Sequence, residues 1–438
     1  MPSKMTEFDT ISHFGPPLTS DSAVKTIPPS NPISLEEYET SKPFEISPED
    51  VAFLESLHAT EQVTPLRVSF TSEGKAVIKT GSHVGVLTLP SGVQIEVTPK
   101  QTVTRLLWAL KYAFDTPVDA LDIETEFTSA SSFFDVLGVL FHAELQSILQ
   151  QGLHRDYVRT RSVREHVRGR IDVQRQLQRP SIVPTDFAVE HDEFTADNHL
   201  NRAVLAALRV LLLLVRDDAL SSRLQYQAQR LREFVSVERV SLSSVERLEL
   251  TRLNDHYEAL LGLTRLILAR DFFEDVRAGE RRSLALFVNM NSVFEQIVER
   301  AFRSVARDIG SLRVSGQASI PNIVTGPHAV KMRPDVLVAR EDGTPVLVAD
   351  AKWKTGSTSS GDIYQLSSYI LALETPGILV YPERGQQGEK KSQVMEEHSL
   401  RSVELATNTD ATTYDEYVAA LEASARRCLE TIEEPELV

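Results

Sequence analysis

The sequence predicts an α+β protein of several domains: a small N-terminal β-domain, a mainly helical middle region and a C-terminal mixed α/β domain. Apolar residues alternate with polar ones early in the chain, recur at helical spacing in the middle, and return to short strand-like runs near the end. The length of 438 residues also exceeds that of an ordinary single domain. We expect boundaries near residues 45, 115 and 284.

Composition narrows the class further. The 46 basic residues against 62 acidic ones give a net charge of −16, which as a global field repels nucleic acid. The longest purely apolar stretch, Val210 to Val215, is too short to cross a bilayer, and the N-terminus has no signal pattern. The single cysteine, Cys428, fits a reducing compartment. We therefore expect a cytoplasmic protein without membrane contact, in which any DNA contact needs a local basic patch, a metal or a partner.

The N-terminal part divides into a tail and a small β-rich domain. Residues 1–45 are rich in proline, serine and threonine, which is typical of a disordered or loosely docked segment. The β-rich domain covers residues 46–115. Its alternating apolar residues predict strands near residues 66–70, 76–78, 84–89 and 93–97.

The middle region, residues 116–284, is predicted to be mainly helical. An arginine-rich segment, residues 155–179, interrupts it with eight arginines and three acidic residues, an excess of five positive charges. This excess indicates either a surface that contacts phosphate or an acidic partner, or a solvated surface held by salt bridges. Both interpretations stay open at this point.

The C-terminal region, residues 285–438, alternates helices and strands. An apolar stripe predicts a helix around residues 293–305, and an Asp-Gly turn joins two strands at 336–339 and 346–349. A further helix around residues 363–373 precedes a buried-looking strand at 378–381. The result is a mixed α/β domain.

Two aspartates and a lysine carry the chemistry that this hairpin suggests. A hairpin holds the end of one strand beside its neighbour, so Asp335 and Asp350 can come close. Two carboxylates forced together repel unless a cation neutralises them, and hard oxygen ligands suit Mg²⁺. Lys352 lies on the same face of the strand as Asp350, where it can orient a water or stabilise charge on phosphorus. Strand-terminal Asp and Lys are more often plain surface residues, but charges beside so apolar a strand are costly without a purpose.

This arrangement resembles the PD-(D/E)xK nuclease core, a restriction-endonuclease-like fold. The resemblance makes Asp335 and Asp350 metal ligands and Lys352 the catalytic lysine, and it adds Glu295 from the preceding helix as a catalytic residue and third ligand. The alternative for Glu295 is a solvated acid on the flank of that helix.

Gln365 and Tyr369 stand one turn apart on the helix after the hairpin. This polar pair can touch phosphate or the attacking water, and we count Gln365 among the candidate catalytic residues and Tyr369 among the contacting ones. The alternative is an ordinary exposed helix face.

Over residues 60 to 385 the chain resembles the McrC family, the nuclease subunits of McrBC-type modification-dependent restriction systems. The matching segments are residues 84–100, 152–157, 168–172, 193–202 and 332–354. The resemblance implies a Mg²⁺-dependent DNA endonuclease that acts in defence against foreign DNA. Its implied partner is McrB, a hexameric AAA+ GTPase that recognises modified DNA.

The resemblance also assigns different functions to different regions of the chain. It implies that residues 116–284 bind the motor ring and stimulate its nucleotide hydrolysis, with Arg168 and Arg170 as candidate contacts to DNA or partner. If the regions are separable, a fragment ending near residue 280 keeps this stimulation. The competing hypothesis is a catalytically silent adaptor that caps and activates the ring.

Other site types find no support in the sequence. The histidines lack metal-ligand spacing, which argues against zinc. No glycines form a phosphate-cradling loop, which argues against nucleotide hydrolysis by this chain.

Overall fold

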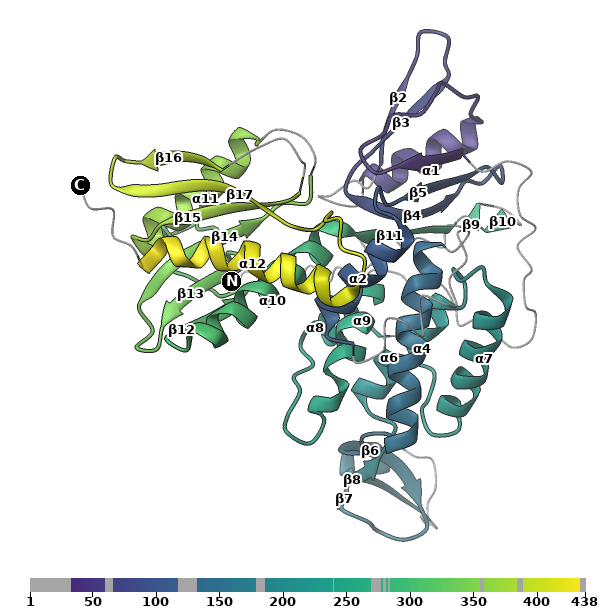
Figure 1. Cartoon of the computed structure of the whole chain (residues 1–438). Helices are drawn as coiled ribbons and strands as arrows, with labels where there is room; N and C mark the ends of the chain where they lie inside the picture. Colours follow the sequence, from purple (N-terminus) through teal and green to yellow (C-terminus); the bar gives the residue numbers. More distant parts are fainter. Residues whose placement is uncertain are drawn as a thin grey trace, which may run out of the picture. The chain divides into compact units, whose positions relative to one another are not determined.

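The computed structural model of the chain has the expected α+β, multidomain character (Figure 1). The described residues form two compact units, one built from the chain up to Thr98 with Arg270–Val288, the other from Pro99–Ala269 with Asn289–Val438. The structure describes residues 33–59, 66–116, 132–178, 186–238, 240–268, 277–278, 281–282, 284–354, 358–383 and 389–433. No helix in these ranges is long and apolar enough to span a bilayer.

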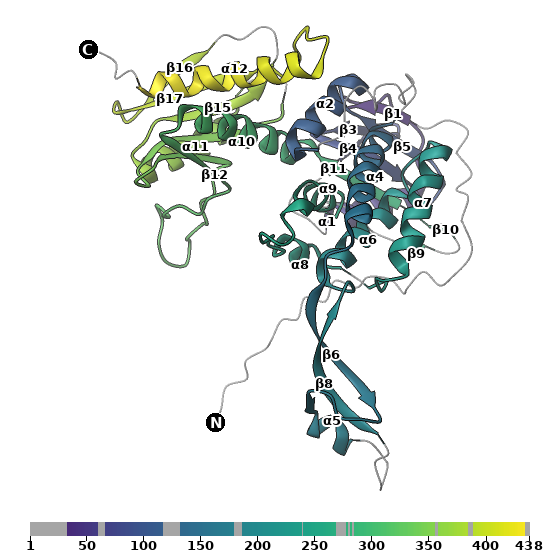
Figure 2. The ribbon, with the colours of Figure 1, turned by 60° about the horizontal axis from the view of Figure 1, so that its bottom comes forward.

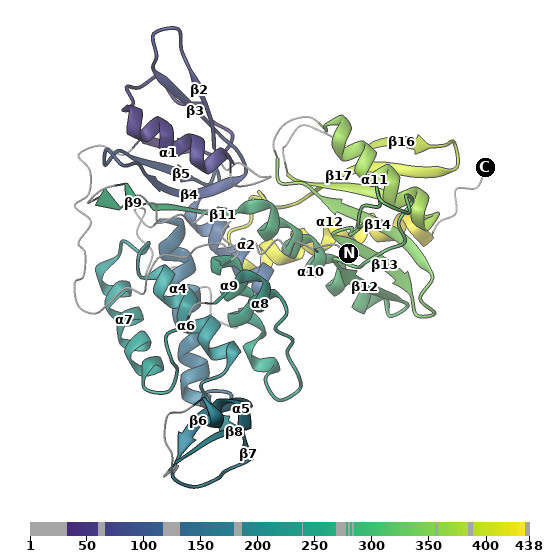
Figure 3. The ribbon, with the colours of Figure 1, turned by 180° about the vertical axis from the view of Figure 1, so that it is seen from behind.

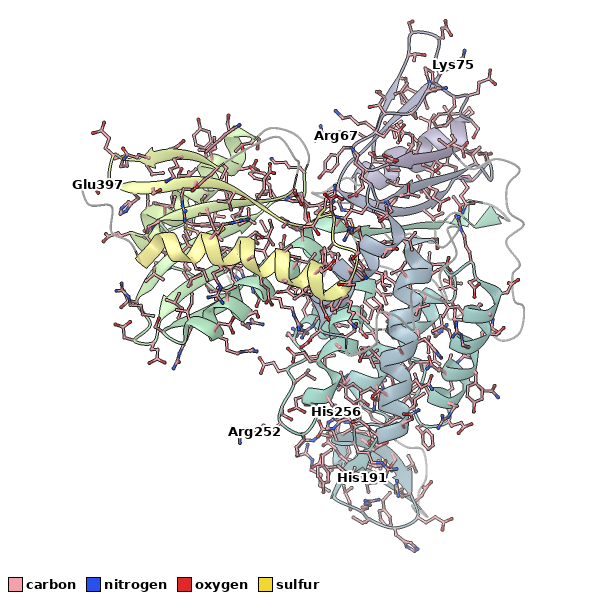
Figure 4. The ribbon with its side chains drawn as sticks, in the orientation of Figure 1. Arg67, Lys75, His191, Arg252, His256 and Glu397 are labelled. Carbon is pink, nitrogen blue, oxygen red and sulfur yellow. The ribbon has the colours of Figure 1, made fainter. Side chains whose placement is uncertain are left out.

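The first unit holds the strands expected for the β-rich domain, but with other bounds than residues 46–115: it ends at Thr98 and adds Arg270–Val288. A four-stranded sheet has the order β1-β5-β4-β11, a two-stranded ladder joins β2 and β3, and a short ladder joins β9 and β10. Figure 4 shows Arg67 and Lys75 on the β2–β3 hairpin. The elements are β1 (Ile33–Glu36), α1 (Pro48–Ala59), β2 (Leu66–Phe70), β3 (Ala76–Thr80), β4 (His83–Thr88), β5 (Gln94–Thr98), β9 (Arg277–Ala278), β10 (Arg281–Arg282) and β11 (Leu284–Asn289).

The predicted tail extended too far into the chain. β1 pairs in parallel with β5, with Ile33 opposite Ile95, and Phe44 bridges to Ala76 of β3. Leu35 is buried in the core of this unit. Ile33 and Phe44 pack against the same core. Residues 33–45 therefore belong to the β-unit, and so short a strand among prolines gave no clear signal in the sequence. The rest of the predicted tail, residues 1–32, lies outside the described residues.

The second unit begins with a bundle of helices. α2 starts at a Thr102 N-cap, whose side chain accepts a hydrogen bond from the backbone of Arg105, and ends at Asp115 in a left-handed conformation. The helices are α2 (Val103–Phe114), α4 (Phe133–Gln151), α6 (His199–Leu211), α7 (Asp218–Arg232), α8 (Leu242–Glu246), η1 (Asp255–Tyr257) and α9 (Glu258–Leu268). α4 packs against α2, α6, α7 and α9 and so forms the centre of the bundle (Figure 1).

The arginine-rich segment forms the first part of a long arm between α4 and α6, which Figure 2 shows projecting from the helices. The arm is a three-stranded sheet of order β6-β8-β7. β6 (Asp156–Arg164) and β8 (Phe187–Thr195) pair along nine residues each, and β7 (Arg170–Ile171) and α5 (Val173–Leu177) lie at the far end. Gly169 makes the turn into β7 with φ +76, where an added Cβ would lie 2.4 Å from the Glu190 carbonyl oxygen.

The root of this hairpin is clamped by a buried polar network. The Tyr257 hydroxyl accepts a hydrogen bond from the His154 backbone N–H and donates to Asn201 Oδ1 (both 3.0 Å). The side-chain amides of Asn198 and Asn201 both donate to the His154 carbonyl (2.9 Å). These residues come from both flanks of the hairpin and from η1, so the hairpin is tied to the helices at its base.

The C-terminal part of the second unit is a six-stranded mixed sheet of order β12-β13-β14-β15-β17-β16 with helices on both faces. Val348, Leu366, Ile370 and Leu379 form a core between the sheet and α11, and α10 and α12 pack together on the opposite side (Figure 3). The elements are α10 (Met290–Ile309), β12 (Leu312–Gly316), β13 (Val336–Arg340), β14 (Pro345–Ala351), α11 (Ser360–Leu373), β15 (Gly377–Pro382), β16 (Lys390–Val394), β17 (His398–Leu405) and α12 (Tyr414–Glu433).

The boundary expected near residue 284 does not separate two compact parts. α10 and α12 pack directly against α2 of the helical bundle. The rings of Trp108 and Tyr417 lie 5.7 Å apart, and Tyr112 donates a hydrogen bond to Glu422 (3.2 Å). β11, in turn, belongs to the first unit. The spacing of apolar residues does change from helical to strand-like near residue 284. Such a change need not coincide with a boundary between hydrophobic cores.

Candidate active site

Strand register brings Asp335 and Asp350 together. In the antiparallel pair of β13 and β14, Val336 stands opposite Ala349, so the two aspartates face each other one step beyond this pair. Asp335 Oδ2 accepts a hydrogen bond from the backbone N–H of Ala351 (2.7 Å). Both aspartates are buried, and Asp350 is 1% exposed. The predicted proximity is therefore confirmed.

Lys352 closes the cluster from the same strand. Its Nζ lies 2.6 Å from Asp350 Oδ2 and donates to Gln365 Oε1 (3.2 Å). The Gln365 amide donates to the Tyr369 hydroxyl (2.9 Å), which donates to the Arg333 carbonyl (3.3 Å). Tyr369 is buried whereas Gln365 is exposed, so the exposed-face alternative does not hold for Tyr369 and stays open for Gln365. The chain of hydrogen bonds fixes the lysine ammonium from the α11 side.

Glu295 approaches the cluster from α10, a helix whose first turn is capped by Asn289. The side-chain amide of Gln317 donates to Asp335 Oδ1 (3.0 Å) and to Glu295 Oε2 (3.4 Å). Glu295 is half-buried rather than extended into solvent. The sequence did not point to Gln317, because it lies in a polar stretch without periodicity.

Burial and neighbouring negative charges raise the pKa values of these three acids. Burial, reinforced by Asp335, raises the pKa of Glu295 to about 8. Burial and the neighbouring Asp350 raise the pKa of Asp335 to about 6. Burial raises the pKa of Asp350 as well, although Lys352 opposes it. For Lys352 burial lowers the pKa, but the attraction of Asp350 outweighs this and leaves the pKa above its ordinary value.

These shifts predict a pH dependence of stability in the metal-free chain. Because the pKa values of Glu295 and Asp335 are raised on folding, the folded state binds more protons than the unfolded state between about pH 4 and 8. The free energy of unfolding therefore falls as pH rises through this window, by on the order of 2–5 kcal/mol. Urea unfolding in EDTA at several pH values measures it.

Glu295→Gln should flatten the pH slope, since the glutamine cannot ionise. The matched control is Glu341→Gln in the exposed turn between β13 and β14, which should keep the wild-type slope. An unchanged slope in Glu295→Gln would contradict the electrostatic account.

The donor set fits a hard divalent cation. Asp350 Oδ2 is buried with the Lys352 ammonium 2.6 Å away, and burial, followed by the closeness of the other acids, raises the pKa values of Glu295 and Asp335. Carboxylate oxygens are the ligands that Mg²⁺ prefers. Within the described ranges, no three His, Cys, Asp or Glu side chains already stand close enough to enclose a metal ion. The aspartates form the centre of this donor set, and direct ligation by Glu295 stays a prediction.

The neighbouring lysine is directed elsewhere. Lys354 pairs with Asp362, whose carboxylate also accepts the backbone N–H of Ser359 in the capping box of α11. The Trp353 backbone N–H donates to Asn291 Oδ1 (3.0 Å), which anchors the end of β14 to α10. Lys352 and Lys354 lie just beyond the end of β14, and there they take different partners.

Arg168 and Arg170 are not part of this cluster but lie on the hairpin arm. Arg170 Nε donates to Glu190 Oε2 (2.7 Å), and Arg161 also pairs with Glu190. Figure 4 shows His191, the next residue of β8, within this arm. Arg168 is exposed and makes no ion pair with any described residue. The salt-bridged interpretation thus accounts for some arginines of the arm and leaves others available.

Fold and site together define the class: a multidomain α+β protein with a buried carboxylate–lysine cluster on a mixed sheet. The family model described as McrBC 5-methylcytosine restriction system component matches residues 78–382. This is well over half of the chain, so the chain belongs to that family, and the identification with McrC made from the sequence is confirmed.

Solved structures are also similar. A half-complex from the tetradecameric assembly of Thermococcus gammatolerans McrB AAA+ hexamers with bound McrC matches with 18% identity and a TM-score of 0.50, covering 92% of this chain and 100% of the matched chain. A cryo-EM structure of the Thermococcus gammatolerans McrBC complex matches with 21% identity and a TM-score of 0.37, covering 62% of this chain and 86% of the other. The first likeness shows a shared fold. No curated protein matches in sequence.

Proposed function

We propose that this chain is the Mg²⁺-dependent DNA endonuclease subunit of a McrBC-like restriction complex. It cuts foreign DNA when assembled with a hexameric AAA+ GTPase that recognises the modified DNA, and it stimulates the nucleotide hydrolysis of that partner. The observation that carries the proposal is the buried cluster of Asp335, Asp350 and Lys352 at the edge of the β13–β14 hairpin.

In this proposal Asp335 and Asp350 hold the metal, with Glu295 as the third acid. Bound Mg²⁺ supplies charge neutralisation at the phosphate and a more acidic water. The protein orients the aspartates in advance, because the Ala351 backbone N–H fixes one carboxylate and strand register fixes the spacing of both. Burial, reinforced by the neighbouring acids, raises the pKa values of Glu295 and Asp335, and a bound cation would favour the ionised form of both.

Lys352 and Gln365 act on the scissile phosphate in this proposal. The ammonium of Lys352 stays protonated beside Asp350, so it can stabilise the charge that develops on phosphorus. Gln365 accepts a hydrogen bond from Lys352, and together with Asp350 it holds the ammonium in place. Tyr369 keeps Gln365 in place.

In this proposal the helical bundle and the hairpin arm bind the partner. The similar Thermococcus McrC is bound to McrB AAA+ hexamers, and the acidic net charge of −16 suits a subunit that borrows DNA affinity from a complex. Exposed Arg168 and Arg175 on the arm offer cationic groups for DNA or an acidic partner surface.

Cleavage of methylated DNA with Mg²⁺, the McrB-like partner and GTP tests the proposal. Metal-dependent cutting that needs all three components supports it. Stimulated GTP hydrolysis without any cutting would instead support the silent adaptor, for which the buried acidic cluster has no purpose.

Reversal of Arg168 and Arg170 to Glu should reduce stimulation of the partner's GTP hydrolysis by roughly 10-fold. Each substitution replaces attraction between an arginine and a negative group at the contact by repulsion between two negative groups. The metal site should stay intact, which Mn²⁺ binding measures. The matched control is reversal of Lys390 and Lys391 to Glu on β16, an exposed pair away from the arm. Equal stimulation by both double variants would exclude these arginines from the contact.

A further inference from the structure

Gln317 occupies a strained and firmly held position beside the acidic cluster. It directly follows β12 and has φ +50, a left-handed conformation that a residue with a side chain rarely adopts. Its backbone N–H donates to the Asp335 carbonyl, and its own carbonyl accepts from Arg333 Nε (both 3.1 Å). The backbone of Gln317 is therefore tied to the segment that leads into β13.

The side chain of Gln317 joins two acids from different elements. One amide nitrogen lies 3.0 Å from Asp335 Oδ1 and 3.4 Å from Glu295 Oε2, and it carries two hydrogens that can serve both. Among the described residues it is the sole hydrogen-bond donor to the Glu295 carboxylate. A single amide thus sets the spacing between a carboxylate on α10 and one at the start of β13.

A purely structural role does not account for this residue. Glycine adopts the left-handed region at less cost than glutamine, and the two backbone hydrogen bonds need no particular side chain. What the glutamine adds is a double donor aimed at two carboxylates, and strained non-glycine residues of this kind cluster at functional sites.

We propose that Gln317 is a positioning residue, which holds the Glu295 and Asp335 carboxylates at the separation needed to share one divalent cation. This inference rests on the proposed function, because it assumes that the cluster binds metal. It assigns Gln317 no contact with DNA and no part in proton transfer. Residues that orient metal ligands through hydrogen bonds typically contribute about 10–100-fold to metal affinity or activity.

Two variants separate positioning from folding. Gln317→Met keeps the side-chain length and the backbone strain but has no donor, whereas Gln317→Gly loses the side chain and the strain together. For the full-length chain we expect Mn²⁺ affinity, measured by calorimetry, to fall about 10-fold in both variants. The melting temperature should be higher for Gln317→Gly than for Gln317→Met. Wild-type affinity in both variants would overturn the inference.

A double-mutant cycle with Glu295→Gln gives a readout that a structural role would not move. If Gln317 acts by placing Glu295, Gln317→Gly should lower Mn²⁺ affinity much less in the Glu295→Gln background than in wild type. Full additivity would overturn the inference while leaving the proposed function standing. A wild-type chain that takes up no Mn²⁺ would overturn the proposed function and this inference with it.

Discussion

Asp350→Asn is expected to abolish DNA cleavage, with a loss of at least ~10³-fold, while the chain stays folded and still stimulates its partner. The substitution keeps the shape of the side chain but removes one of the two central negative charges from a buried place, where Asp350 is 1% exposed. Because burial already raises the pKa of Asp350, a neutral side chain costs the fold little. Lys352→Ala should behave likewise, since its ammonium pairs with Asp350.

The measurements are cleavage with Mg²⁺, partner and GTP, beside a thermal melt and the partner's GTP hydrolysis. Matched controls are Asp308→Asn and Lys391→Ala, which change an exposed ion pair with Arg426 and an exposed side chain of β16. Exposed pairs contribute about 0–1 kcal/mol, so both controls should cut DNA normally. Full cleavage by Asp350→Asn or Lys352→Ala would reject the proposed site.

A chain ended after residue 280 is expected to lose its cooperative fold. The cut removes α10 and α12 from the surface of α2, where the buried Trp108 lies against Tyr417 and the buried Tyr112 donates a hydrogen bond to Glu422. Fully burying a large apolar side chain contributes about 1.5–3 kcal/mol, so exposing these two removes a large part of the net stability of a domain, about 5–15 kcal/mol. The cut also removes β11 from the four-stranded sheet of the first unit.

Circular dichroism melts and limited proteolysis of the fragment measure this loss. The control shortens the hairpin arm instead: residues 160–191 are replaced by Asn-Gly, a two-residue turn that suits the remaining paired strands. That chain keeps the α2, α10 and α12 contacts and should melt cooperatively. A fragment to residue 280 that melts as sharply would show that the helical bundle folds alone and that the boundary near residue 284 is real.

The order of elements in the C-terminal part was predictable because each has a strong local signal. The apolar stripe of α10, the Asp-Gly turn and the run at residues 378–381 all appear where expected. The pairing of Asp335 with Asp350 follows from the same signals, since a tight hairpin leaves few registers. The chemical roles of these residues are not settled by that geometry.

Other features had no local signal. β6 carries arginines at positions 159, 161 and 164, and its apolar residues are too few to show a buried face. β1 is four residues long, and it depends on β5 for its hydrogen bonds. Gln317 and Asn291 contact the cluster through long-range hydrogen bonds, which no spacing rule reveals. The domain boundaries were mispredicted for the same reason, because α2 is covered by α10 and by α12, and the contact of Tyr112 with Glu422 of α12 spans 310 residues of chain.

The hairpin arm is fixed at its base by hydrogen bonds to the His154 backbone from Tyr257, Asn198 and Asn201. It can therefore tilt only as a unit about this point. A nine-residue strand spans about 30 Å, so a tilt of about 10° at the pivot moves the far end by roughly 5 Å. The same geometry applies in reverse. A force on the tip of the arm acts over this length on the root, where β6 follows α4 and β8 leads into α6. We therefore expect a displacement of the arm to load the hydrogen bonds at its base, which join it to the residues around α6 and η1.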